Sequence, residues 1–248
     1  MDEKTVITSR RQSAMNPRAR PIMRILIFSV FVIVVFFASL SRRPPAWTRR
    51  FGSQTPPVTT SKLVPLEAHI ISKCPDTRDA LRELILPVMQ QVSDKVDFKL
   101  NYIGTPVGDD GIKCKHGPDE CMGNIVELCA RELYSDPKTN LGFIYCLTKK
   151  YPDIPKQALV EDCALEHQVD VRLLNECATR DDGAYGLNLL RESVKRSAEA
   201  NATISCTVRL NNQVYCIHDG GKWIQCPQGP AVSDLVSAIK KLHGPSSS

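Results

Sequence analysis

All ten cysteines of this 248-residue chain lie after residue 73. Disulfides persist in oxidising compartments such as the secretory lumen and are rare in the cytosol. This one-sided use of cysteine predicts a C-terminal domain that folds in a lumen and is cross-linked by disulfides. The triplet Asn201-Ala202-Thr203 is an N-glycosylation acceptor sequence, which predicts a glycan at Asn201 and agrees with a lumenal domain.

An apolar segment over residues 22–40 stands before the first cysteine. Its length is close to the ~20 residues that a helix needs to cross a membrane, so it predicts a transmembrane signal anchor. A cleaved signal peptide is the alternative and would make the protein secreted, but its apolar region usually has ~7–15 residues and ends at a small-residue cleavage site. Here Ser41-Arg42-Arg43 follows directly. Because arginines flank both ends, the cysteines decide the orientation. They predict a single-pass type II protein with its domain in the secretory or endosomal–vacuolar lumen.

Charge is distributed unevenly along the chain. The net charge is +5, yet residues 1–50 carry ten Lys/Arg against two acidic residues, which leaves −3 for the remainder. The basic excess therefore flanks the membrane segment, and the folded part gives no reason to expect nucleic acid as a partner. We expect a cytosolic basic tail over residues 1–21, a Pro/Ser/Thr-rich stalk over residues 41–62 and a lumenal domain over residues 63–243.

The lumenal domain is expected to open with a strand, a helix and a second strand. Leu63–Ser72 is an apolar run long enough for a buried strand, and Val96–Tyr102 alternates apolar with polar residues as a half-buried strand does. Between them, an apolar stripe of helical spacing starts after Pro75, and Pro87 is expected to kink this helix rather than end it. Such a unit favours a right-handed crossover and a parallel pair of strands.

The rest of the domain continues the α/β pattern. Residues 122–200 indicate several short helices, and a last amphipathic helix begins near Val232. Three further strands are expected over Ile204–Leu210, Val214–Ile217 and Trp223–Gln225. This order of elements predicts a thioredoxin-like α/β fold with a disulfide-rich helical insertion, preceded by one transmembrane helix.

Cys74 stands where the first strand gives way to the first helix, directly before Pro75. The positive end of a helix dipole and its unpaired N–H groups stabilise a thiolate, and proline suits the first helical turn. This placement favours a redox-active cysteine. An ordinary structural disulfide at Cys74 is the alternative.

A second motif is more specific. Residues 114–129 read Cys-Lys-His-Gly-Pro-Asp-Glu-Cys-Met-Gly-Asn-Ile-Val-Glu-Leu-Cys. This run resembles the signature of the gamma-interferon-inducible lysosomal thiol reductase family: Cys-Gln-His-Gly, two residues, Glu-Cys, two residues, Asn, four residues, Cys. Lys115 is the one departure. Three further cysteines are similar to those of the family: Cys146, Cys163 and Cys177. The resemblance implies a thioredoxin-like fold that reduces disulfides of client proteins in an acidic endosomal or vacuolar lumen.

The same motif contains residue types that bind zinc, namely Cys114, His116, Cys121 and Cys129. Their spacing is not that of a zinc finger, and an oxidising lumen favours disulfides. We therefore expect no metal and no other cofactor. His116 and Glu120 are expected to fix the loop rather than to take part in chemistry.

The sequence departs from the family's pattern at the active-site motif. The family motif is Cys-x-x-Cys, in which the second thiol attacks the mixed disulfide and releases the client. Here Thr77 takes that place. Its hydroxyl can donate a hydrogen bond to the Cys74 thiolate but cannot resolve a mixed disulfide. Asp76 opposes the thiolate electrostatically, with Arg78 as a partial offset.

A second departure concerns Cys206. The family places a cis-proline before the third strand, against the active-site sulfur, and alignment by eye puts Ser205-Cys206 at about this position. Cys206 could therefore face Cys74, and the two would be able to pair if their Cα atoms lay within about 7 Å.

Parity agrees with that pairing. The structural disulfide candidates are Cys114, Cys121, Cys129, Cys146, Cys163, Cys177, Cys216 and Cys226. Three bridges among the first six and one between the last two would leave Cys74 and Cys206. In the alternative, Cys206 bridges to Cys216 or Cys226 and Cys74 stays free.

Two functions follow, and both stay open at this point. The first is a thiol–disulfide oxidoreductase of altered mechanism, in which Cys74 is the nucleophile and Thr77 orients its thiolate. Either Cys206 or an external thiol such as glutathione would complete the reaction. The second is a catalytically degraded thioredoxin-like binding module that keeps the fold for its surface. Disulfide-containing client proteins and a small thiol reductant are the expected partners.

Overall fold

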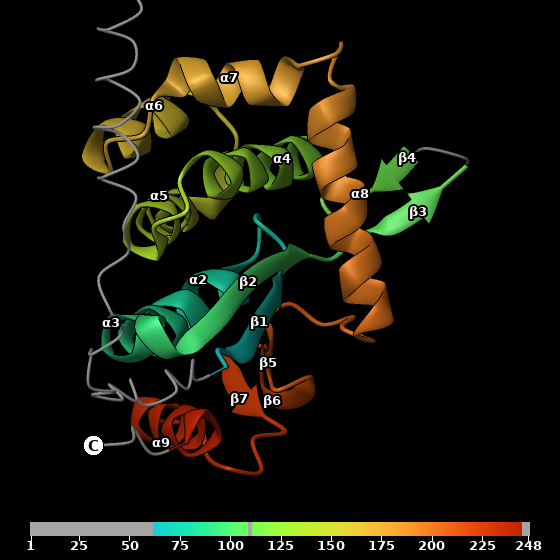
Figure 1. Ribbon diagram of the computed structural model, residues 1–248. Coiled ribbons are helices and arrows are strands. Elements are labelled where there is room, and N and C mark those ends of the chain that lie inside the picture. Colours follow the sequence, from blue (N-terminus) through green and yellow to red (C-terminus); the bar gives the residue numbers. More distant parts are fainter. Residues whose placement is uncertain (1–61, 109–110, 245–248) are drawn as a thin grey trace, which may run out of the picture. The chain divides into compact units, whose positions relative to one another are not determined.

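A five-stranded mixed sheet lies at the centre of the part of the chain that this computed structural model describes, residues 62–108 and 111–244 (Figure 1). The strands are ordered β2-β1-β5-β6-β7. Their bounds are Val64–Ile70 (β1), Val96–Tyr102 (β2), Thr207–Leu210 (β5), Gln213–Asp219 (β6) and Lys222–Ile224 (β7). The predicted parallel pairing of β1 with β2 is confirmed, and the other neighbours are antiparallel.

A continuous helical run connects β1 to β2, and it changes from α-helical to π-helical geometry and back. It comprises α2 (Pro75–Ala80), a π-helical segment (Leu81–Ile85) and α3 (Leu86–Val92). Pro87 lacks the N–H that would bond to the carbonyl four residues earlier, and a wider π turn is one way to accommodate that loss. Pro87 thus interrupts the α-helical pattern without ending the helical run, as predicted.

One face of β1 is apolar and fully buried. Leu66, Ala68 and Ile70 are each at most 1% exposed, because β1 is flanked by β2 and β5 and is packed on both faces. The positions of β1 and α2 are therefore tightly fixed, and the turn that joins them is held from both sides.

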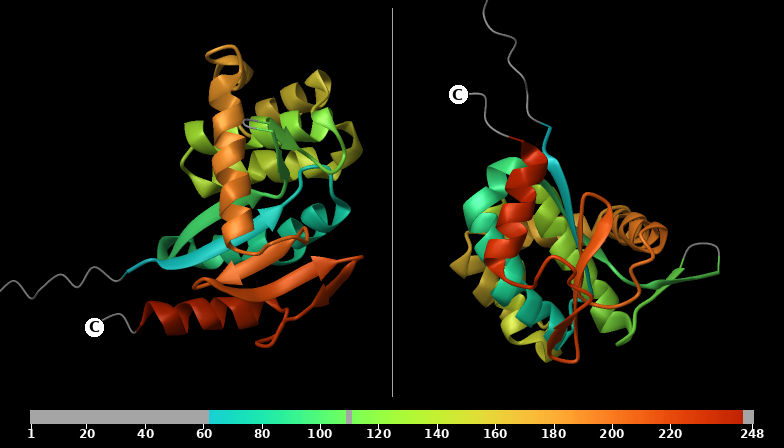
Figure 2. Two further views of the ribbon diagram at one scale, coloured as in Figure 1. Left: turned by 90° about the vertical axis from the view of Figure 1, so that its right-hand side faces the viewer. Right: turned by 90° about the horizontal axis from the view of Figure 1, so that it is seen from below.

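Five helices form the predicted insertion. They are α4 (Pro118–Leu133), α5 (Pro137–Lys149), α6 (Gln157–Glu166), α7 (Val171–Thr179) and α8 (Ala184–Glu199). Figure 1 shows α4 to α7 stacked to one side of the sheet, and α8 runs beside β2. The Cys129–Cys177 and Cys146–Cys163 disulfides join α4 to α7 and α5 to α6. The last helix, α9 (Val232–His243), packs beside α3 at the opposite end of the domain (Figure 2).

A buried ionic cluster ties the end of the insertion to the sheet. The Glu67 carboxylate on β1 accepts two hydrogen bonds from Arg196 on α8 and one from Arg209 on β5, each 2.7 Å long. Burial acts to raise the pKa of Glu67, but the Arg196 hydrogen bonds and the nearby positive charges outweigh it, so the pKa lies below its ordinary value.

A short hairpin escaped sequence analysis. It consists of β3 (Thr105–Val107) and β4 (Gly111–Lys113), and the side chains of β3 are exposed. Strands of three residues without a buried face show no alternation of apolar and polar residues. A prediction from hydrophobic periodicity therefore cannot detect them.

The predicted anchor over residues 22–40 lies outside the described residues, as does the basic tail over residues 1–21 and nearly all of the stalk. Among the residues that are described, none of the helices has the length and apolar character needed to cross a membrane.

Candidate active site

Cys74 caps the amino end of α2 and lines a pocket. It follows β1 by a short turn, and Pro75 occupies the first turn of the helix, as predicted. The side chain is a free thiol with 9% exposure, and its Sγ lies 4.0 Å from the carbonyl oxygen of Ser205. It borders a pocket of about 480 Å³. The Cys74 side chain, although largely buried, is therefore placed in the wall of a pocket.

The pocket has walls of opposite charge. Lys113 and Lys115, on either side of Cys114, line one part, and Asp76 and Asp219 line another. The remaining wall is formed by Ile71, Ile103, Gly104, Thr105, Thr203, Ile204 and Ser205. The pocket thus lies between the β1–α2 turn, the β3–β4 hairpin and the segment before β5.

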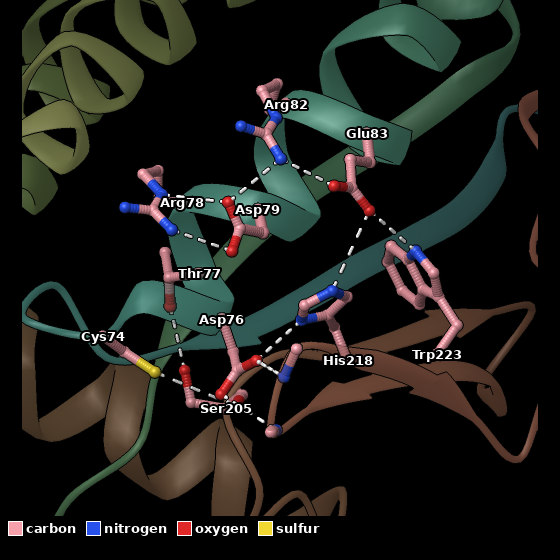
Figure 3. Close-up of polar contacts among 12 residues, drawn as sticks. Cys74, Asp76, Thr77, Arg78, Asp79, Arg82, Glu83, Ser205, His218 and Trp223 are labelled. Atoms are coloured by element: carbon pink, nitrogen blue, oxygen red, sulfur yellow. Dashed lines mark hydrogen bonds and ion pairs between the residues drawn. The ribbon is translucent and has the colours of Figure 1, made fainter.

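The Thr77 hydroxyl does not contact the Cys74 sulfur, contrary to the predicted role in orienting the thiolate. Thr77 is fully buried, and its hydroxyl donates to the Ile71 carbonyl at 2.9 Å. It also lies 2.9 Å from the Ser205 hydroxyl, which accepts from the Ile71 N–H at 2.9 Å. These bonds close a ring in which Ile71 N–H donates to Ser205, Ser205 to Thr77 and Thr77 to the Ile71 carbonyl. Thr77 therefore holds the end of β1, the start of α2 and the Ser205 loop together (Figure 3).

Thr77→Val is expected to destabilise the domain by about 1–3 kcal/mol, because it leaves buried polar groups of Ile71 and Ser205 without their partner. Chemical denaturation of the two proteins measures the change. Thr77→Ser keeps the hydroxyl and should recover most of the loss. A valine variant as stable as the wild type would contradict the hydrogen-bond ring.

Asp76 is held in place by three donors. Its carboxylate accepts from His218 Nδ1 at 2.8 Å and from the N–H groups of Gly220 and Gly221 at 3.2 Å and 2.9 Å (Figure 3). Arg78, from which a partial offset was predicted, forms its ion pair with Asp79 at 2.9 Å. The hydrogen bond from Arg78 is also the main cause that lowers the pKa of Asp79.

Cys206 is a free thiol with no exposure, and neither predicted bridge forms at it. It follows a cis peptide bond after Ser205, and its N–H donates to the His218 carbonyl in the continuation of β5. Burial raises the pKa of the Cys206 thiol, and the nearby Cys74 and Asp76 add to the rise. Cys206 is therefore disfavoured as a thiolate and does not line the pocket.

The eight other cysteines are paired. The bridges join Cys114 to Cys121, Cys129 to Cys177, Cys146 to Cys163 and Cys216 to Cys226. The alternative in which Cys206 bridges to Cys216 or Cys226 is thus wrong in this structure. The zinc alternative is wrong for the same reason, since its three cysteines are bonded to other sulfurs and offer no thiolate. One Cys/Glu/His group does come together, at Cys146, Glu166 and His167, but there too the cysteine is bridged.

The loop of residues 114–121 is fixed by its own polar residues. Glu120 is fully buried, accepts from the Lys115 N–H at 2.9 Å and contacts the His116 ring. These contacts agree with the structural role expected for both residues. Asn124 extends the network, because its Oδ1 accepts from the Ser72 N–H at 3.1 Å and its amide nitrogen lies 3.7 Å from Cys114 Sγ.

Sequence analysis missed two residues that shape the site. Ser205 bonds to Thr77, 128 positions away, and His218 bonds to Asp76, 142 positions away. Figure 3 shows His218 also facing Glu83, to which Trp223 donates at 3.3 Å. Contacts at such separations leave no local signal in a single sequence.

Comparisons with known proteins agree with this geometry. Residues 65–167 match the family model described as gamma interferon inducible lysosomal thiol reductase. GILT-like protein 1 of Drosophila melanogaster is 27% identical over 167 residues, which cover 60% of this chain and 66% of that protein. The gamma-interferon-inducible lysosomal thiol reductase-like protein of Anopheles gambiae is 26% identical over 136 residues, which cover 49% and 56%. The matches thus span less than two thirds of the relatives' own lengths.

Solved structures show the same fold. The disulfide bond oxidoreductase DsbG of Mycobacterium tuberculosis, in its reduced form, aligns with a TM-score of 0.50 and 16% identity over 76% of this chain and 82% of that one. The thiol-disulfide oxidoreductase MdbA of Actinomyces oris aligns with a TM-score of 0.50 and 11% identity over 72% and 81%. The described domain therefore has the thioredoxin-like fold of these structures, and its residues 65–167 are similar to the gamma interferon inducible lysosomal thiol reductase family.

Proposed function

We propose that the domain catalyses thiol–disulfide exchange on disulfides of client proteins, with Cys74 as the nucleophile. One observation carries the proposal: of the two free thiols in the described residues, only Cys74 borders the pocket. The Cys74 thiolate attacks a client disulfide and forms a mixed disulfide, while the other client sulfur leaves as a thiolate. Thr77 has no sulfur with which to complete the reaction, so a second thiol has to come from elsewhere.

The family name and the cysteine distribution support an acidic lumenal compartment as the place of action. We keep the type II anchor over residues 22–40 and the glycan at Asn201 as part of this proposal. Asn201 is exposed, so an oligosaccharide transferase could reach it. A small thiol reductant would supply the electrons that the reduced client takes up.

A trapping experiment tests the proposal. The reduced protein is mixed with a denatured client that carries one disulfide, quenched with alkylating agent and separated without reductant. We expect a covalent adduct through Cys74, identified by peptide mass spectrometry, and loss of client reduction in Cys74→Ala. Circular dichroism serves to show that the variant is folded. Equal client reduction by the wild type and Cys74→Ala would overturn the proposal.

The second candidate is a binding module whose redox centre has decayed. The buried Thr77 in the resolving position favours it, because the site lacks the thiol that completes the reaction in Cys-x-x-Cys enzymes. This function predicts that Cys74→Ala binds the denatured client as tightly as the wild type does and that no covalent adduct forms.

A further inference from the structure

A second pair of sulfurs borders the pocket of Cys74. Cys114 lines the same pocket, at 3% exposure, and is bonded to the half-buried Cys121. None of the other three disulfides contributes a residue to this pocket. The Cys114–Cys121 disulfide is thus the one bridge in the described residues that is placed beside the proposed nucleophile.

Burial opposes a thiolate at Cys114, but several neighbouring groups would stabilise negative charge on the two sulfurs. Lys113 and Lys115 flank Cys114 and place two positive charges at the pocket wall. The Asn124 amide nitrogen, 3.7 Å from Cys114 Sγ, offers a hydrogen bond to a thiolate there. Cys121 lies in the first turns of the 16-residue helix α4, where the helix dipole stabilises negative charge.

The site is also linked mechanically to the Cys74 turn. Asn124 accepts from the Ser72 N–H at 3.1 Å, and the Ser72 hydroxyl lies 3.4 Å from the Glu120 carbonyl. Ser72 stands two positions before Cys74 in the same turn. The segment that carries Cys114 and Cys121 is therefore bonded to the segment that carries the nucleophile.

We propose that Cys114 and Cys121, in their reduced form, are the resolving dithiol that Thr77 cannot replace. This inference rests on the proposed function. Cys74 first forms the mixed disulfide with the client. The Cys114 thiolate then attacks the Cys74 sulfur, forms a Cys74–Cys114 bond and releases the second client thiolate. The Cys121 thiolate attacks Cys114, forms the Cys114–Cys121 bond seen here and returns Cys74 as a thiolate.

Electrons and protons balance over the cycle. The client disulfide gains two electrons and two protons, and the Cys114/Cys121 dithiol loses them. A small monothiol of the glutathione class restores the dithiol and leaves as its own disulfide. The structure thus represents the oxidised state of the resolving pair together with a free Cys74.

Cys121→Ser gives the decisive experiment. The variant can form the Cys74–Cys114 bond but cannot break it, so we expect this bridge to accumulate after one client turnover. Peptide mass spectrometry without reduction detects it. A disulfide requires Cα atoms within about 7 Å, so the bridge also reports that the two segments approach each other. Steady-state client reduction at low monothiol concentration should fall at least about tenfold. The double variant Cys146→Ala/Cys163→Ala, which removes a disulfide remote from the pocket, is the matched control and should keep its activity.

Cys114→Ser should instead stop one step earlier, with the client still bonded to Cys74. If wild type forms the Cys74 adduct and turns over, but Cys121→Ser retains full turnover and yields no Cys74–Cys114 bridge, an external thiol resolves the adduct and this inference is overturned. If no variant forms any Cys74 adduct, the proposed function itself has failed. The two failures are therefore distinguishable even where Cys114→Ser does not fold.

Discussion

In the Cys121→Ser background, where the proposed resolving dithiol is broken, Thr77→Cys is expected to raise the turnover of client disulfide reduction at least about tenfold at low concentrations of small thiol. The side chain of Thr77 and the sulfur of Cys74 both contact Ser205, at 2.9 Å and 4.0 Å, so a thiol at position 77 would stand beside the nucleophile. A built-in resolving thiol has an effective concentration of millimolar or more, against which a dilute external thiol competes poorly. Thr77 is fully buried, and a cysteine side chain is close to threonine in size, so it fits this position but gives up the hydroxyl's bonds to Ile71 and Ser205.

The rate of client reduction and the redox state of Cys74 measure this result. On oxidation, the thiol introduced by Thr77→Cys should form a disulfide with Cys74, whereas Thr77→Ser, which keeps the hydroxyl, should behave as the wild type. In the Cys121→Ser background, Thr77→Cys should restore turnover, because the introduced thiol bypasses Cys114. No gain from Thr77→Cys in the Cys121→Ser background would contradict the assignment of the mixed disulfide to Cys74.

Sequence patterns predicted most strands and turns of the domain, because each of these elements depends on residues that lie close together in the sequence. The alternation over Val96–Tyr102 corresponds residue for residue to β2, and the parallel pair followed from the strand–helix–strand order. The paired asparagines Asn211 and Asn212 mark the β5–β6 turn, where both adopt positive φ. The β3–β4 hairpin shows no such pattern and was missed.

The site was harder to predict because its contacts span the chain. Thr77 was assigned to the Cys74 thiolate because it takes the place of the second cysteine of Cys-x-x-Cys, but its hydroxyl bonds to Ile71 and Ser205 instead. The position of Cys206 beside Cys74 was foreseen, whereas its free state was not. An even number of cysteines suggests that all of them are paired, but it carries no information on the burial or orientation of each sulfur. Cys74 is largely buried, and its place in the wall of a pocket follows only from the arrangement of β1, the hairpin and the segment before β5.

Glu127 is a buried carboxyl group that no part of the proposed chemistry uses. It lies on α4 with no exposure, and the Tyr102 hydroxyl donates to its Oε2 at 2.7 Å. Its Oε1 has no hydrogen-bond partner among the described residues. Burial raises the pKa of Glu127 to about 8; the Tyr102 hydrogen bond opposes the rise and the nearby Glu120 adds to it. The folded domain therefore keeps this proton at acidic pH.

The stability of the domain is consequently expected to depend on pH through Glu127. The unfolded chain releases this proton near the ordinary pKa of 4.5, whereas the folded domain keeps it up to about 8. The stabilisation that comes from the proton on Glu127 is thus fully present below pH 4.5. It is lost as the pH rises to about 8. Between pH 5 and pH 8 the loss should be on the order of 4 kcal/mol.

Glu127→Gln isolates this effect, because the amide has the shape of the protonated acid and does not titrate. Buried His69, whose pKa burial lowers to about 4, acts in the opposite direction below its ordinary 6.5, but it is present in both proteins and cancels in the difference. We expect chemical denaturation to show the two proteins nearly equal in stability at low pH and the variant more stable as the pH approaches 8. Parallel stability curves for the two proteins would show that Glu127 is ionised in the fold. A domain that gains stability by keeping this proton would be suited to the acidic compartment in which we propose that it acts.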